Sequence, residues 1–379
     1  EGAEPAAVAY AAAGAFRGQE AGTMRASYRF NRARTVQEFA EGASWIAMSH
    51  NFFVATRDGD IGYWHCVRPP RRNPAYDPRL PLPGTGEAEW QGFIPFDQIP
   101  QVINPKSGYL INWNNKPAPW WPNFDQPVWG EIFRIHRIET LVNARPKLSF
   151  ELARAILPDI GLNDPTADYL KPHLVRALEP LAGSNRTAQR VLDALLAWDN
   201  HAEDDNVPKA FFDNWVRAMR EVIWREELGG VLARREYDRL LQPSAILHVL
   251  AGKDSGVPLA YDFLKGKSAQ EAIVQAAYVT VTEMQKKEPD PTRWGYRQPL
   301  IDFKPLPGIP NTSRGTYIQI VEVAKQRFRA VNILPPGQSE DPASPHFSDQ
   351  RELAGYWKFK PMLFTREELG AATASGSTR

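Results

Sequence analysis

The chain has 379 residues, with 45 Lys plus Arg against 44 Asp plus Glu and a formal net charge of +1. This balance provides no long-range field for a phosphate backbone or an anionic membrane surface, which argues against nucleic acid and membranes as partners. The one cysteine, Cys66, excludes a disulfide framework or a thiolate metal site built from this chain, and we expect it to be a small buried hydrophobe. No apolar stretch reaches the ~18 residues of a membrane helix.

Composition changes twice along the sequence, which predicts three domains. The first, residues 1–148, is β-rich, the second, 149–290, is a helical lobe, and the third, 291–379, returns to β-structure. Strands at both ends with helices between them favour the α+β class, with the helical block as an insertion.

The β-rich part begins with a predicted hairpin. An apolar run from Asn51 to Ala55 is followed by Asp58-Gly59, a pair that favours a tight reversal, and then by Ile61–Trp64. The segment Pro69–Pro127 is crowded with Pro, Gly, Trp and Asn, and we predict ordered loop there because proline fixes φ and removes a donor. Its aromatic side chains either pack these loops or line a ligand cleft, and we expect mainly packing.

The helical lobe is predicted from apolar residues at three- and four-residue steps. Ser149 and Thr187 are the predicted N-caps of two helices, and Phe211–Ile223 and Ala269–Met284 form two more. The acidic run Glu203–Asp205 lacks the alternating ligands of a calcium loop, so we interpret it as a solvated turn.

The carboxyl-terminal part is predicted to contain a second hairpin, with strands at Tyr317–Val323 and Phe328–Leu334 joined by a turn at Ala324–Arg327. Apolar residues occur on both faces of this hairpin, which is typical of a buried sheet.

No familiar catalytic signature is present: the sequence lacks GxSxG, HExxH and a Walker loop. The seven histidines are scattered, and none pairs with another at metal-ligand spacing, which argues against a metal enzyme. His346, in a turn, and His50, beside Asn51 but on the other strand face, are conceivable bases that we expect to be structural.

Several short motifs carry more information. In the first half they are Ser49-His50-Asn51-Phe52-Phe53-Val54-Ala55, Asp58-Gly59-Asp60-Ile61-Gly62-Tyr63, Pro70-Arg71-Arg72, Leu82-Pro83-Gly84, Trp90-Gln91-Gly92, Asn104-Pro105-Lys106-Ser107-Gly108 and Asn112-Trp113-Asn114-Asn115. Near the carboxyl end they are Asn311-Thr312-Ser313-Arg314-Gly315, Pro336-Gly337-Gln338-Ser339, Ser344–Gln350 and Trp357–Met362. Together these motifs resemble the penicillin acylase family of N-terminal-nucleophile hydrolases, from about residue 25 to the end, most weakly in the helical middle.

The resemblance implies part of an αββα sandwich and a definite chemistry. Family members are precursors that cleave themselves into an α chain and a β chain, whose new N-terminal serine attacks an amide with its own α-amine as base. By the motif match, Asn51 is the asparagine that stabilises the oxyanion. Arg72 matches the arginine that orients this asparagine and the nucleophile, although Arg71 leaves that register open by one.

The sequence departs from the family pattern at its start. It begins at Glu1, which has no hydroxyl nucleophile, and only fifty residues precede Asn51. We therefore expect a processed or truncated chain, the carboxyl-terminal portion of β, which needs an α chain and the serine-bearing part of β as partners and is inactive alone.

The resemblance also implies a small-molecule N-acyl substrate, no catalytic cofactor, an optional structural calcium ion, and periplasmic or secreted location in a bacterium. Two alternatives stay open: a non-catalytic relative that uses the Trp-rich loops as a binding or scaffold surface, and a carbohydrate-active domain. The latter needs a pair of cleft carboxylates ~5 to 9.5 Å apart, and the sequence suggests no such pair.

Overall fold

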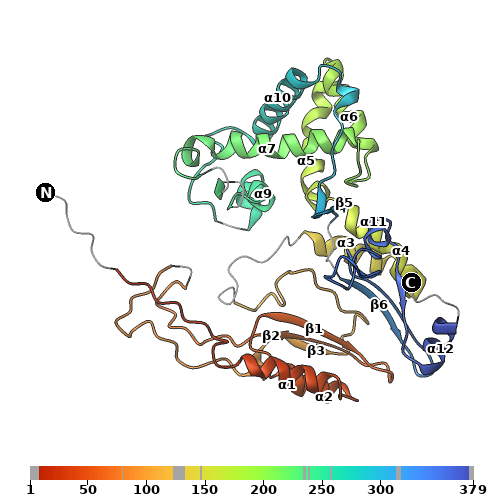
Figure 1. Cartoon of the computed structure of the whole chain (residues 1–379). Coiled ribbons are helices and arrows are strands. Elements are labelled where there is room, and N and C mark those ends of the chain that lie inside the picture. Colours follow the sequence, from red (N-terminus) through yellow and green to blue (C-terminus); the bar gives the residue numbers. More distant parts are fainter. Residues whose placement is uncertain are drawn as a thin grey trace. The chain divides into compact units, whose positions relative to one another are not determined.

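We describe the fold from a computed structural model of the chain (Figure 1). The structure describes residues 8–78, 80–122, 133–145, 147–233, 236–237, 240–256, 258–312 and 317–374. The chain divides into two compact units, one of residues 1–135 and 321–329 and the other of residues 136–320 and 330–379. The domain limits at 148 and 290 stay predictions.

The first unit pairs two helices with a small sheet (Figure 1). Its elements are α1 (Glu20–Phe30), α2 (Val36–Ala43), β1 (His50–Ala55), β2 (Ile61–Cys66), the 3-10 turn η1 (Phe96–Gln98) and β3 (Gln101–Ile103). The strands are antiparallel in the order β1-β2-β3. The sequence prediction included neither helix and treated the β3 segment as loop.

The predicted hairpin of β1 and β2 is confirmed. The backbone N–H of Thr56 donates to the carbonyl of Asp60 at 2.9 Å, and Gly59 has a φ of +98°, a conformation that glycine adopts without steric cost. The resulting register places Asn51 opposite His65.

Strand alternation gives this sheet two different faces. One face packs on the helices, where Phe30 stacks on Phe39 with ring centroids 4.3 Å apart and Phe39 lies 5.5 Å from the buried Trp64. Since side chains one residue further along each strand point the other way, Asn51 and His65 lie on the face away from the helices. The core of the first unit therefore fixes the sheet that carries the predicted oxyanion residue.

Gly62 provides a stability test of this core. A Cβ at this buried position in β2 would lie 2.3 Å from the ring of Trp64, too close for any atom pair. We expect Gly62→Ala to lower the free energy of unfolding by roughly 1–3 kcal/mol, because the tryptophan must move within a packed core. Thermal unfolding would measure this loss. Gly84→Ala is the control, since an added Cβ meets nothing within 4 Å there, and equal effects of the two changes would contradict the prediction.

The second unit contains a lobe of helices that cross around an apolar core (Figure 1). The helices of this part of the chain are α3 (Arg134–Asn143), α4 (Phe150–Leu162), α5 (Pro165–Ala182), α6 (Arg186–Ala197), α7 (Val207–Leu228), α9 (Pro243–Ala251), η2 (Gly252–Ser255), α10 (Ala269–Lys287) and η3 (Pro291–Arg293). Phe212 and Trp215 of α7 are fully buried in this core. None of the helices within the described ranges is long and apolar enough to cross a membrane.

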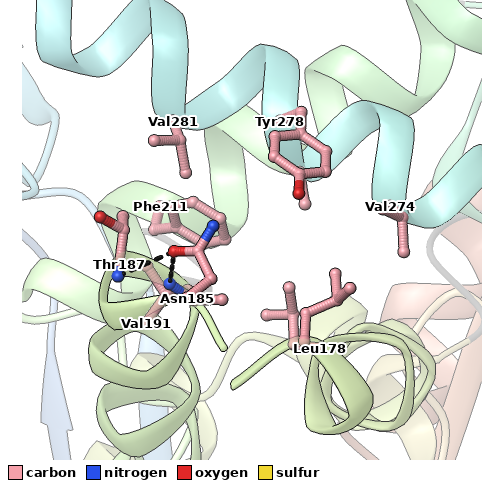
Figure 2. A pocket seen from close by; sticks show the side chains of 11 residues that line it. Leu178, Asn185, Thr187, Val191, Phe211, Val274, Tyr278 and Val281 are labelled. Atoms are coloured by element: carbon pink, nitrogen blue, oxygen red, sulfur yellow. Dashed lines mark hydrogen bonds between the residues drawn. The ribbon is translucent and has the colours of Figure 1, made fainter. Parts of the chain in front are cut away.

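Of the two predicted N-caps, Ser149 is confirmed and Thr187 is wrong. Ser149 caps α4 as predicted, accepting a hydrogen bond from the N–H of Leu152 at 3.1 Å. Thr187 as the cap of α6 is wrong: Asn185 is the cap, and its side-chain oxygen accepts from the N–H groups of Thr187 and Ala188, each at 3.0 Å (Figure 2). Asparagine is among the strongest N-cap residues, and its carbonyl oxygen reaches both orphan donors here.

A hollow of about 50 Å³ lies beside Asn185, lined by side chains of α5, α6, α7 and α10 (Figure 2). Its lining is almost wholly apolar, with Leu178, Phe211 and Val281 as typical members. No charged side chain is among the described residues that line it, and its polar members are Asn185, Thr187 and Tyr278.

The acidic run behaves as the predicted solvated turn. Glu203, Asp204 and Asp205 are exposed. Asp204 accepts a hydrogen bond from the N–H of Gln298 at 2.7 Å, and Asp205 pairs with Arg297 at 3.2 Å. The run thus anchors the segment that follows η3.

The carboxyl-terminal part contains β4 (Leu300–Phe303), β5 (Leu306–Pro310), β6 (Ile318–Val323), β7 (Phe328–Ile333), α11 (Arg351–Gly355), β8 (Lys360–Met362) and α12 (Arg366–Ala374). The predicted hairpin of β6 and β7 is confirmed, with Ala324 N–H donating to the Arg327 carbonyl at 2.8 Å. Burial of both its faces is wrong in part, because Val321 and Phe328 are 41% and 43% exposed.

Candidate functional site

Asn51 lies in β1, half-buried, on the sheet face away from α1 and α2. Two residues of β2 share this face: His65, directly opposite Asn51, and Tyr63, opposite Phe53. The alternation of the hairpin therefore gathers a polar group around the asparagine that the sequence singles out.

Three side chains hold the Asn51 amide. Its carbonyl oxygen Oδ1 accepts a hydrogen bond from the Tyr63 hydroxyl at 2.6 Å and lies 3.1 Å from His65 Nδ1. Because an amide oxygen only accepts, His65 carries its proton on Nδ1 in this arrangement. On the other side, Asn51 Nδ2 donates to Asn112 Oδ1 at 3.2 Å. Nδ2 has two N–H groups, and within the part of the chain that the structure describes only one of them has an acceptor, so the other can donate to a substrate.

The loop that brings Asn112 to this site is itself fixed by hydrogen bonds. Asn112 Oδ1 also accepts from the N–H of Asn114 at 3.0 Å, and Asn112 Nδ2 donates to the Asn115 carbonyl at 3.3 Å. Arg134 donates to Asn114 Oδ1 at 3.1 Å and lies over the Trp113 ring at 4.9 Å. Asn112 is thereby a positioned acceptor rather than a free loop side chain.

Aromatic rings surround the polar group. Phe53 packs on Tyr63 with ring centroids 5.0 Å apart, and Trp121 meets His65 edge-on at 6.0 Å. Tyr63 and His65 are only 7% and 1% exposed, whereas Phe53 is 43% exposed. The face around Asn51 thus combines a rigid polar interior with an open apolar rim, and β1 is an edge strand of the sheet within the described residues.

Burial sets the protonation of two groups in β2. It raises the pKa of Tyr63 well above its ordinary value, so the phenol stays a hydrogen-bond donor at any physiological pH. It raises the pKa of Cys66 to about 12, so this fully buried thiol is not a nucleophile. The prediction that Cys66 is a small buried hydrophobe is confirmed.

The two arginines after β2 differ in their surroundings. Arg71 is exposed and donates to the Phe93 carbonyl and to Gln98 Oε1, both at 3.3 Å. Arg72 is half-buried, and its guanidinium lies 5.8 Å from the centre of the Trp90 ring. No hydrogen bond joins Asn51 to either arginine within the described part of the chain. The orienting role of Arg72 stays a prediction.

His346 has the environment expected of a structural histidine. Its Nδ1 lies 3.0 Å from Asp349 Oδ2 in an exposed turn, and its backbone carbonyl accepts from the N–H groups of Gln338 and Ser339 at 2.9 and 3.1 Å. These contacts tie together two of the carboxyl-terminal motifs. Of the Asn311–Gly315 motif, residues 313–315 lie outside the described residues.

Metal ligands do not gather at this site. Among the residues that the structure describes, no group of three or more His, Cys, Asp or Glu side chains is placed to hold a metal ion. The polar atoms around Asn51 belong to amides, a phenol and an imidazole, which suits hydrogen bonding to a developing negative charge.

Tyr63, His65 and Asn112 were not among the predicted site residues. Tyr63 and His65 could have been found from the hairpin, since the Asp58-Gly59 turn fixes which residues face Asn51. Asn112 gave no such signal, because it reaches the site from a loop 61 residues away in sequence.

Comparisons with known proteins agree on one family. The penicillin amidase family model matches residues 2–371. Penicillin G acylase of Escherichia coli is 26% identical over 411 residues, covering 96% of this chain and 48% of that protein. Penicillin acylase 2 proenzyme of Pseudomonas sp. (strain SE83) is 26% identical over 390 residues, covering 90% and 48%. The chain thus spans about half the length of the curated relatives it matches.

A solved structure is also similar. Thermostable penicillin G acylase from Alcaligenes faecalis in orthorhombic form matches with a TM-score of 0.83 and 24% identity, covering 94% of this chain and 72% of that one. This likeness confirms the predicted fold class, α+β of the N-terminal-nucleophile hydrolase type with a helical insertion.

Proposed function

Because the chain belongs to the penicillin amidase family, we propose that it is part of an amide hydrolase that cleaves N-acyl compounds through a serine acyl-enzyme. The observation that carries this proposal is the Asn51 amide. Its carbonyl oxygen accepts from two partners, while among the described residues only one of its two N–H groups has an acceptor. Such an N–H stabilises the oxyanion of a tetrahedral intermediate without bringing a countercharge.

In the proposed reaction, the α-amine of an N-terminal serine takes the proton of its own hydroxyl as Oγ attacks the amide carbon. The carbonyl oxygen becomes negative and accepts a hydrogen bond from Asn51 Nδ2. When the C–N bond breaks, the proton passes to the leaving amine, and water then hydrolyses the acyl ester. Arg72 is proposed to orient Asn51 and the nucleophile, in keeping with its half-buried position. Arg71 is instead hydrogen-bonded to the Phe93 carbonyl and to Gln98.

The nucleophile is proposed to come from outside these 379 residues, from the serine-bearing part of the β chain, with an α chain as further partner. The relatives are about twice as long, and one is named a proenzyme. Within the described residues β1 is an edge strand, and its edge together with the exposed ring of Phe53 gives that additional polypeptide a surface beside Asn51. We also propose that the assembled protein binds a structural calcium ion and is exported to the periplasm or the medium.

A non-catalytic relative would differ at this face. A binding or scaffold module needs no ordered cage of Tyr63, His65 and Asn112 around Asn51. The hydrogen bonds that Asn51 Oδ1 accepts from Tyr63 at 2.6 Å and from His65 at 3.1 Å favour the hydrolase.

The test is to isolate the full-length protein and sequence the amino terminus of every chain that copurifies. We expect one chain to begin with serine, and we expect hydrolysis of at least one amide among phenylacetyl, glutaryl and long-chain acyl substrates. Replacing that serine with alanine is the control and should abolish turnover. A single folded chain without such a terminus that hydrolyses these amides would refute the proposed mechanism, and inactivity on all of them would favour the scaffold.

A further inference from the structure

Two hydrogen bonds to one oxygen set the orientation of the Asn51 amide. Asn51 Oδ1 accepts a hydrogen bond from the Tyr63 hydroxyl at 2.6 Å and another from His65 Nδ1 at 3.1 Å. We infer that Tyr63 and His65 are positioning residues that orient and polarise the oxyanion donor, an inference that rests on the proposed function. They touch Asn51 rather than the substrate.

A flipped amide is disfavoured by its neighbours. After a half-turn about its terminal bond, Asn51 would point its oxygen at Asn112 Oδ1, which already accepts from the N–H of Asn114. Two acceptor oxygens would then face each other, and His65 would have to take its other tautomer, with Nδ1 as an acceptor, to keep a bond to Asn51. The observed orientation is therefore the one that satisfies the cage and leaves an N–H for the substrate.

Donation to the oxygen also strengthens the N–H groups. Hydrogen bonds in a chain polarise one another, with a gain of roughly 10–30% per bond, because electron density drawn toward the carbonyl leaves the amide nitrogen more positive. The cage thus prepares Asn51 for a negative charge before the charge forms, which saves reorganisation during the reaction.

Packing around Tyr63 and His65 holds both donors in place. Tyr63 packs on the ring of Phe53, and His65 is fully buried and packs against the ring of Trp121. The phenol keeps its proton because burial raises the pKa of Tyr63. Both donors are protein side chains held by packing, so neither depends on mobile solvent.

The first variant is Tyr63→Phe in the full-length protein, which removes one hydroxyl and keeps the ring packing. We expect kcat to fall roughly tenfold with KM unchanged within about twofold, because the lost bond acts on the transition state through Asn51. Tyr278→Phe is the matched control, since this exposed residue of α10 lines only the apolar hollow (Figure 2). It should leave kcat unchanged.

A pair of changes at His65 provides an independent test. His65→Leu removes the donor and should lower kcat about as much as Tyr63→Phe. His65→Asn offers an amide N–H near the position of the imidazole Nδ1, and we expect it to restore most of kcat. If His65 had a purely structural role, His65→Leu would keep kcat, because an apolar side chain suits a buried site, and His65→Asn would not.

A double-mutant cycle separates this inference from the proposed function. In the Asn51→Ala background, Tyr63→Phe should cause no further loss of kcat, because its effect passes through Asn51. Equal losses in both backgrounds, or a kcat within about twofold of the parent for both Tyr63→Phe and His65→Leu, would overturn the inference alone. A normal kcat for Asn51→Ala itself would overturn the proposed function with it.

Discussion

Replacing Asn51 with alanine in the full-length protein is expected to lower kcat by roughly 10²–10³-fold and to leave KM nearly unchanged. The reason is that one neutral N–H donor aimed at an oxyanion typically contributes ~3 to 4 kcal/mol of transition-state stabilisation, which the ground-state carbonyl uses only weakly. Initial rates on an accepted amide substrate measure both parameters. A comparable fall in kcat/KM caused by KM alone would mean that Asn51 binds substrate and does not stabilise the transition state.

Two further variants make this test specific. Asn51→Asp keeps an acceptor for Tyr63 and His65 but replaces the donor with negative charge, so it should be at least as inactive as Asn51→Ala. Asn143→Ala, at the exposed end of α3, is the control for an asparagine removed from a surface and should keep full activity. An active Asn51→Asp enzyme would show that no hydrogen bond from this side chain is needed.

The second large effect is expected at Lys209, an almost fully buried lysine of α7. Its Nζ lies 3.1 Å from Asp164 Oδ2 and forms a short ion pair with Asp213. Burial lowers the pKa of Lys209, but attraction to the two carboxylates outweighs burial and leaves the pKa raised, so the ammonium stays charged. We expect Lys209→Met to lower the free energy of unfolding by about 3–5 kcal/mol, because two carboxylates would remain without their cation. Urea unfolding at neutral pH measures this change.

The same variant has a pH signature. Burial raises the pKa of Asp213 in the folded protein above its ordinary value. A carboxyl whose pKa is raised on folding binds its proton more tightly in the folded state, so it favours unfolding as pH rises through that range and favours folding as pH falls. With Lys209 gone, the deficit against the parent should shrink as pH falls from neutral toward ~4, the ordinary range of aspartate. A deficit that grows on acidification would contradict this assignment.

The control for Lys209 is Lys286→Met, at an exposed lysine of α10 that pairs with Glu283 at 2.6 Å. Solvent screens such surface pairs, so little change in stability is expected. Similar losses for the two lysines would show that lysine removal in general, and not burial of the ion pair, destabilises the lobe.

The sequence predicted the elements that have strong local signals. Asp58-Gly59 located the hairpin that carries Asn51, and Ser149 marked the start of α4, because turn and cap chemistry act within a few residues. The α2 helix was missed although Thr35 and Glu38 have capping-box spacing, and the Thr35 side chain accepts from the Glu38 N–H at 3.1 Å. The α1 helix has no side-chain cap at its start and gave no such signal.

The site was predictable only in its centre. Asn51 was identified from motif resemblance, and the hairpin register would have added Tyr63 and His65. Asn112 depends on the fold of a Pro- and Trp-rich loop whose hydrogen bonds run between its own asparagines, and no local periodicity encodes where such a loop lies. The strand β3 was missed for a similar reason, since three residues pair with β2 from within that loop.

The most direct test of the central claim is a crystal structure of the assembled full-length protein with a tetrahedral transition-state analogue bound to its nucleophile. We predict that Asn51 Nδ2 lies 2.7–3.1 Å from the anionic oxygen of the analogue, the usual range for an oxyanion donor, while Oδ1 keeps its bonds to Tyr63 and His65. An anionic oxygen held by other donors, with Asn51 Nδ2 beyond hydrogen-bonding distance, would contradict the assignment of Asn51 as the oxyanion donor.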